Sequence, residues 1–182
     1  MFDLFKARAE AARAEVYRFP AKAEALDFLV AFLSKNGLAD QPRARAVCAA
    51  CGLLGDGDRR RLAALPGLSV DVTRERAADA RFGISQMEWA LADTGTLAQD
   101  STAVEQRLVS SLPSVHIALV PTDGLLPDLP SLLTRLSPLK SGYLALVTGP
   151  SRTADIERVL TIGVHGPERL LILFVDESGV PA

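Results

Sequence analysis

The chain has 182 residues, of which 48% are hydrophobic and 5% aromatic, and it carries a formal net charge of −2. This length and hydrophobicity suit one folded domain and exclude a disordered chain. The lack of a basic surplus excludes a general binder of the nucleic-acid phosphate backbone. No apolar run reaches the roughly 20 residues that cross a bilayer, and the first residues lack a signal-peptide pattern. We therefore expect a cytoplasmic protein with no membrane insertion and no nucleic-acid partner.

The first 36 residues are expected to form an N-terminal helical segment. Residues 2–18 are rich in Ala, Arg and Glu, which favour helix by propensity but give a weak apolar stripe. Residues 21–36 repeat apolar side chains at helical spacing, and Gly37 follows as a stop signal. That apolar face comprises Leu26, Leu29, Val30 and Leu33.

The remainder, residues 37–182, is expected to form one α/β domain. Buried strands are predicted at residues 45–50, 68–73, 115–120, 143–147 and 170–175, and helices at 59–65, after Thr102, at 129–136 and from Thr153. Residues 74–82 are predicted as a loop or irregular helix, 85–88 as a capped helical turn, and 89–92 with 96–99 as strands around a turn. Because helices and strands alternate, the pattern predicts a three-layer fold, with a mostly parallel central sheet and helices on both faces.

Chemistry-bearing residues are concentrated in Thr148-Gly-Pro-Ser-Arg-Thr-Ala-Asp-Ile-Glu157, where a predicted buried strand passes into a predicted helix. Ligands of open α/β sheets bind off the carboxyl ends of strands, and a helix N-terminus there offers free N–H groups. Gly149 allows a close backbone approach, and Arg152 offers a fork suited to a carboxylate or phosphate. We predict a ligand-binding loop made of Gly149, Pro150, Ser151, Arg152, Thr153, Asp155 and Glu157.

A purely structural interpretation of this segment stays open. Ser151 or Thr153 could cap the helix, with Asp155 complementing its dipole. Asp155 and Glu157 would also repel a phosphate, so they suit a ligand with donor groups or a bound cation. A small carboxylate held by Arg152 is a further alternative.

Two other bends carry polar groups. Gly163-Val-His165-Gly166-Pro167 makes His165 a candidate general acid or base near neutral pH, with Gly163 and Gly166 beside the ligand. The alternative is a histidine that satisfies a turn.

The third bend, Thr94-Gly95-Thr96, could present hydroxyls and N–H groups to the same ligand. A tight hairpin explains it equally well.

Cys48 and Cys51 are interpreted as buried small hydrophobes. No second cysteine pair follows them, and an offset of three residues would place their side chains on opposite faces of a strand. Two cysteines cannot hold a four-cysteine iron–sulfur cluster, and the common nucleotide and protease fingerprints are missing. We predict no metal and no cofactor on this chain.

Several segments, in this order, resemble the LUD domain and most closely its lactate-utilisation protein C type. They are Gly83-Ile84-Ser85, Ala92-Asp93-Thr94-Gly95-Thr96-Leu97, Leu112-Pro113 with His116-Ile117, and the two segments at 148–157 and 163–167. The resemblance covers residues 83–176 well and the earlier part only by element order. It implies a fold similar to the sugar-phosphate isomerase, CoA-transferase and formyltetrahydrofolate cyclo-ligase superfamily, with residues 37–182 as the LUD-like domain. The link after Gln99 departs from the family pattern, which leaves the role of Arg107 open.

The resemblance also implies a role in oxidising L-lactate to pyruvate, with iron–sulfur clusters on partner proteins. This chain would be a non-redox subunit whose pocket takes a small organic acid or a nucleotide-like ligand. The alternative is a stand-alone transferase or ligase-type enzyme acting on a nucleotide, CoA or folate-like substrate, which rests on fold analogy. A third reading is an interaction module with a relict pocket. The sequence does not determine the oligomeric state.

Overall fold

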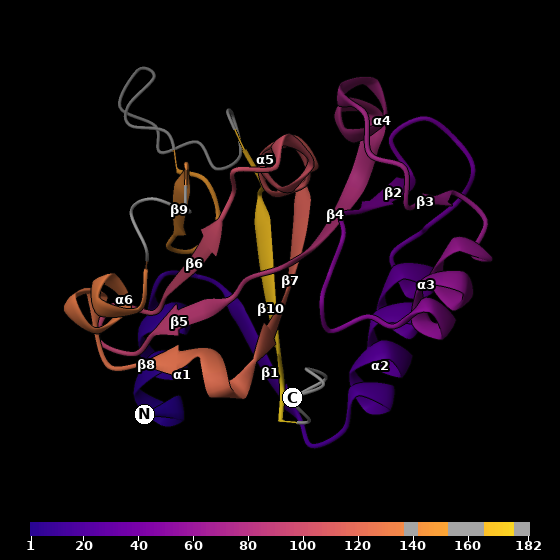
Figure 1. The fold of residues 1–182 in the computed structure, drawn as a ribbon. Helices are drawn as coiled ribbons and strands as arrows, with labels where there is room; N and C mark the ends of the chain where they lie inside the picture. The colour runs from indigo at the N-terminus through magenta and orange to yellow at the C-terminus, as the bar shows by residue number, and fades with distance from the viewer. Residues whose placement is uncertain (137–141, 153–165, 177–182) are drawn as a thin grey trace.

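A six-stranded parallel sheet forms the centre of the computed structural model (Figure 1). The structure describes residues 1–136, 142–152 and 166–176. The order across the sheet is β1-β10-β7-β4-β2-β3. The strands are β1 (Glu15–Phe19), β2 (Arg45–Cys48), β3 (Leu68–Ser69), β4 (Ala80–Gln86), β7 (Val115–Pro121) and β10 (Arg169–Val175).

A second, smaller sheet lies against one face of the central sheet, in the order β8-β5-β6-β9. Its strands are β5 (Trp89–Leu91), β6 (Thr96–Asp100), β8 (Leu125–Leu126) and β9 (Leu144–Val147). β5 and β6 form an antiparallel hairpin, and β9 pairs antiparallel with β6. The short helix η1 (Thr122–Gly124) leads from the central sheet into β8.

Helices cover both faces of the central sheet (Figure 1). α2 (Lys22–Lys35) and α3 (Asp56–Ala63) pack on one face. α1 (Phe2–Ala11), α4 (Arg74–Asp79) and α5 (Val104–Ser111) pack on the other, beside the small sheet. α6 (Leu129–Arg135) packs on the small sheet.

The core is explained by the apolar runs of β7 and β10, which are typical of strands buried on both faces. Because side chains alternate along a strand, Ile117 and Leu171 point into the core under α2. Ala118 and Ile172 point into the core under α1. His116 of β7 shares the side of Ala118 and is completely buried.

The parallel sheet with helices on both faces was predicted correctly, as were the strands that became β2, β7 and β10 and the hairpin of β5 and β6. The predicted helix at residues 129–136 is α6, and the apolar face at 21–36 belongs to α2.

Four local predictions were wrong. Residues 15–19 are strand β1, because Arg13 breaks the helix with a φ of 69° and β1 then pairs with β10. Residues 85–88 form no capped helical turn, since Ser85 lies inside β4. The strand predicted at 68–73 is only two residues long. β9 is a partly exposed strand of the small sheet and not a buried strand of the central one.

The helix predicted from Thr153 lies outside the described residues. Within the described part of the chain, no helix is both long and apolar enough to span a membrane.

Candidate functional site

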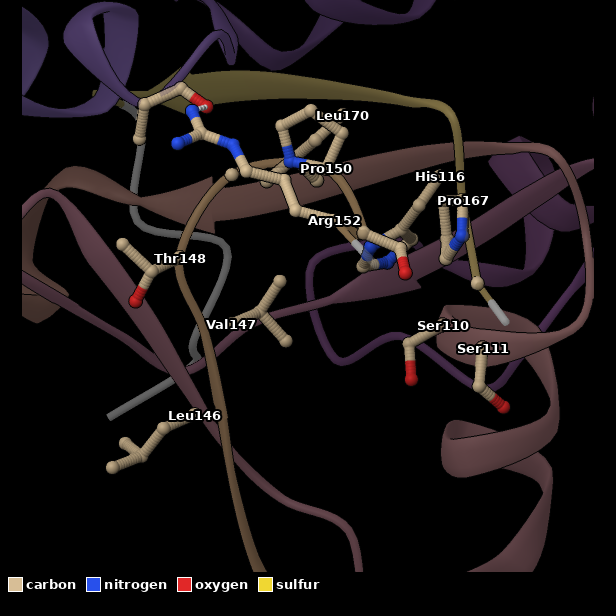
Figure 2. A pocket seen from close by; sticks show the side chains of 14 residues that line it. Ser110, Ser111, His116, Leu146, Val147, Thr148, Pro150, Arg152, Pro167 and Leu170 are labelled. Carbon is tan, nitrogen blue, oxygen red and sulfur yellow. Dashed lines mark hydrogen bonds between the residues drawn. The ribbon is translucent and has the colours of Figure 1, made fainter. Parts of the chain in front are cut away.

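A pocket of about 600 Å³ lies where the loop after β9 meets the starts of β7 and β10 (Figure 2). Figure 2 shows Ser110 and Ser111 of α5 on one side and Leu146, Val147 and Thr148 on the other. Its volume falls in the range that is usual for small-molecule sites. The remaining lining residues are Ala12, His116, Gly149, Pro150, Ser151, Arg152, Gly166, Pro167 and Leu170.

The pocket lies at the amino edge of the central sheet, whereas the sequence predicted the carboxyl ends of its strands. β9 belongs to the other sheet, so its carboxyl end delivers the following loop to the starts of the parallel strands. There the N–H of Ser151 donates to the carbonyl of Pro167 over 2.8 Å. The N–H of Glu168 donates to the carbonyl of Ser114, just before β7, over 2.7 Å.

His116 is the most unusual group in the pocket wall. Its Nε2 lies 2.8 Å from Oγ of Ser85, and its Nδ1 is buried without a hydrogen-bond partner. Burial lowers the pKa of His116 from 6.5 to about 4, so the imidazole is neutral near pH 7. When the Ser85 hydroxyl donates to Nε2, Nδ1 carries the ring proton and is a buried donor without an acceptor among the described residues.

Glycine at position 83 brings α5 down onto the sheet beside His116. A Cβ there would lie 2.1 Å from the carbonyl oxygen of Val109, so no larger residue fits without movement of α5. Gly83 is opposite His116 in the pairing of β4 with β7. The close approach holds the last turn of α5, with Ser110 and Ser111, at the pocket.

Arg152 is the only charged residue among the described residues that line the pocket. It is exposed, and its Nη2 donates to the carbonyl of Ala12 over 2.9 Å. No ion pair to Arg152 occurs among the described side chains. The hydroxyls of Ser110 and Ser111 donate back to the carbonyl of Arg107, which leaves their oxygens as acceptors.

Two of the three predicted bends meet at the pocket. Gly149, Pro150, Ser151 and Arg152 line it from one bend, and Gly166 lines it from the other. Gly149 has a φ of 69°, and a Cβ there would lie 2.3 Å from the carbonyl oxygen of Ala12, so it seats the loop on the end of α1.

The third bend does not line this pocket, and it packs on α1. Gly95 has a φ of 68°, and a Cβ there would lie 2.4 Å from the backbone nitrogen of Ala9 in α1. Thr94 is exposed and donates to Asp93. Thr96 is buried and its Oγ1 lies 2.8 Å from Oγ1 of Thr148, which ties the hairpin to the pocket loop.

The other predicted site residues, Thr153, Asp155, Glu157, Gly163 and His165, lie outside the described residues. Arg107 lies away from the pocket wall, where it donates to the carbonyls of Ser101 and Thr102 and stacks over Tyr143 at 5.0 Å. It therefore holds the start of α5.

Sequence reasoning missed His116, Ser110 and Ser111 as pocket residues. His116 had a signal, because a histidine inside an apolar strand is a buried polar group that needs an explanation. Ser110 and Ser111 had none, since two serines near a helix end are common. Among the described residues, no group of three or more His, Cys, Asp or Glu side chains could hold a metal ion.

The fold and pocket define an α/β domain with a pocket of small-molecule size at one edge of its sheet. A solved structure supports the fold: a DUF162 family protein from Deinococcus radiodurans aligns with a TM-score of 0.62 at 20% identity. That alignment covers 96% of this chain and 95% of the other.

The chain belongs to the LUD domain family, which matches residues 2–175 and so includes the N-terminal helical segment. Lactate utilization protein C of Halalkalibacterium halodurans is 36% identical over 110 residues, covering 57% of this chain and 47% of that protein. The protein of the same name from Exiguobacterium sp. is 34% identical over 113 residues, covering 59% and 49%. These alignments span about half the length of the relatives.

Proposed function

We propose that this chain acts in lactate utilisation as a subunit that binds a small organic carboxylate in the pocket beside His116. The carrying observation is the buried, neutral imidazole in the pocket wall whose Nδ1 has no partner among the described residues. An unpaired buried polar atom costs about 1–3 kcal/mol, which a ligand oxygen at Nδ1 would recover. The relatives named lactate utilization protein C support the pathway.

The charge of the pocket favours an anion. Arg152 is the charged group of the described wall, and a guanidinium binds a carboxylate through two parallel hydrogen bonds. The serine oxygens of α5 can accept from a ligand hydroxyl. A 2-hydroxy acid has both the carboxylate that Arg152 would bind and the hydroxyl that the serine oxygens would accept from.

Electron transfer in this proposal belongs to iron–sulfur partner proteins, which makes the chain a non-redox subunit. The sequence has two cysteines, too few for a four-cysteine cluster. Copurification of the tagged chain with proteins that carry the iron–sulfur absorption bands would support this assignment, and a chain that purifies alone from lactate-grown cells would contradict it.

Binding is tested by calorimetry and thermal unfolding with L-lactate, pyruvate and other short carboxylates. A ligand at about 100 times its Kd stabilises the native state by roughly 2.7 kcal/mol, or about 5–10 °C for a domain of this size. Arg152→Gln and His116→Gln are expected to weaken binding at least about tenfold, the loss of one charge-assisted or buried hydrogen bond. Arg60→Gln, an exposed arginine on α3 across the sheet, is the matched control.

The pocket volume favours a second candidate. About 600 Å³ is more than a three-carbon acid fills, so a stand-alone transferase or ligase acting on a nucleotide, CoA or folate-like substrate is the alternative. ATP, CoA and folates therefore belong in the same screen. Stabilisation by one of these and none by the carboxylates would replace the first proposal with the second.

The role in the cell is tested by complementation. A Bacillus subtilis strain that lacks its lactate utilization protein C, a relative 34% identical over 113 residues, would receive this chain or its variants. Growth on L-lactate that depends on Arg152 and His116 is the expected result. Growth restored equally by both variants would indicate an interaction module whose pocket is unused.

A further inference from the structure

Cys48 and Cys51 lie together at the carboxyl end of β2. Their thiols donate to the same acceptor, the carbonyl oxygen of Ala49, over 3.5 Å and 3.2 Å. The prediction that they point to opposite faces is wrong, because β2 ends at Cys48 and Cys51 lies beyond the strand. Both are buried in one core cluster, as free thiols, and they are the only cysteines of the sequence.

This end of the sheet is where the strand connections diverge (Figure 1). β2 leads through α3, on one face, to β3. Its neighbour β4 leads through the hairpin and α5, on the opposite face, to β7. In open parallel sheets, such a divergence leaves a crevice at the carboxyl ends of the two strands, which is the usual place for a reactive site.

A small pocket of about 100 Å³ opens beside this crevice, between the end of β2, α3 and Val70, which follows β3. Cys48 is one of its buried lining residues, while Ala50, Arg59 and Val70 around it are exposed. At roughly 30 Å³ per water, this space holds about three waters. It therefore admits a molecule the size of hydrogen peroxide and excludes a tripeptide disulfide.

The two thiols differ in acidity. Hydrogen bonding by the Cys51 thiol holds the pKa of Cys48 below its usual value, against the effect of burial, and the charge of Arg59 adds to this. The same hydrogen bond and burial raise the pKa of Cys51 well above its usual value. Cys48 is thus the sulfur that ionises first, and the thiolate is the reactive form.

We propose that Cys48 and Cys51 form a second site, a dithiol that reacts with hydrogen peroxide and closes to an intramolecular disulfide. The Cys48 thiolate attacks one peroxide oxygen, the O–O bond breaks, and hydroxide leaves, so that Cys48 becomes a sulfenic acid. The Cys51 sulfur then attacks the Cys48 sulfur, the S–O bond breaks, and water leaves with the proton of Cys51. Two thiols are oxidised, and one peroxide is reduced to two waters.

The test exposes the reduced full chain to hydrogen peroxide. The chain is then denatured in the presence of a maleimide, which labels the remaining free thiols, and its mass is measured by mass spectrometry. The expected product has lost two hydrogens, takes up no maleimide and is restored by dithiothreitol. C51S is expected to stop at a sulfenic acid on Cys48 that dimedone captures. C48S is expected to lose its remaining thiol at least about tenfold more slowly than wild type loses Cys48.

Two further comparisons separate a native site from thiols that react only on unfolding. The native reaction is expected to keep its rate in low urea, and a rate that rises with the unfolded fraction would overturn the proposal. Arg59→Gln is expected to slow oxidation severalfold, while Arg60→Gln on the same helix leaves the rate unchanged. Equal rates in C48S and wild type, no dimedone adduct in C51S, or a faster reaction with oxidised glutathione than with peroxide would also overturn it.

Discussion

Replacing His116 with Gln is expected to remove a pH-dependent cost of folding. The ring is completely buried, and Nε2 lies 2.8 Å from Oγ of Ser85. A glutamine amide can reach the same hydroxyl but has no proton to gain. Because burial lowers the pKa of His116 from 6.5 to about 4, the unfolded chain binds a proton near pH 5 that the native state does not bind.

The difference between the unfolded and native pKa of His116 sets the sign and size of the pH-dependent change in the free energy of unfolding. The folded pKa is depressed, so the native state loses stability as the pH falls through 6.5, and the loss is complete near pH 4. The full effect is about 3 kcal/mol, at about 1.36 kcal/mol per pKa unit, and about 2 kcal/mol of it is reached by pH 5. For a domain of this size, 2 kcal/mol corresponds to roughly 4–8 °C in Tm.

The assay is urea unfolding of wild type and H116Q at several pH values between 5 and 7.5, followed by circular dichroism. The free energy of unfolding of the variant, relative to wild type, is expected to rise by about 2 kcal/mol as the pH falls over this range. The difference between the two proteins is the informative quantity, because Glu88 titrates over the same range with the opposite sign. A difference that stays constant from pH 7.5 to pH 5 would refute the assignment of a neutral, buried His116.

Three other predictions follow from the same structure. Burial raises the pKa of Glu88 from 4.5 to about 7, so wild type loses stability as the pH rises. In the same urea assay, the free energy of unfolding of E88Q relative to wild type should rise by about 2–3 kcal/mol between pH 5 and 7.5. Gly83→Ala should lower the free energy of unfolding in urea by about 2–3 kcal/mol, because its Cβ meets Val109. Gly57→Ala, in open space on α3, should raise it by up to about 1 kcal/mol. Equal effects of the two substitutions would contradict this account. Gly149→Ala should lower Tm and weaken ligand binding in calorimetry together, since its Cβ would push the pocket loop off Ala12; lower Tm with intact binding would separate the loop from the site.

Much of the fold could be predicted from local patterns. Local patterns predicted β7 and β10 from their apolar runs and α6 from its leucine spacing. Each pattern lies within a single strand or helix, so that element could be recognised from its own residues. β1 was not, because its residues have no strong strand pattern and become a strand through pairing with β10, more than 150 positions away in the sequence. The loop after β9, residues 148–152, was predicted as a polar loop from its Gly, Ser and Arg residues. Its position at the amino edge of the central sheet was not predicted.

The sequence by itself determined the class of fold and the polar loop after β9, because periodicity and residue type act over a few neighbouring positions. The tertiary structure alone decided which distant groups meet. It set His116 against Ser85, seated Gly149 on α1, and brought Cys48 and Cys51 to one side of a strand end. Such meetings depend on how the strands are ordered and where each one ends, and packing across the whole chain determines both.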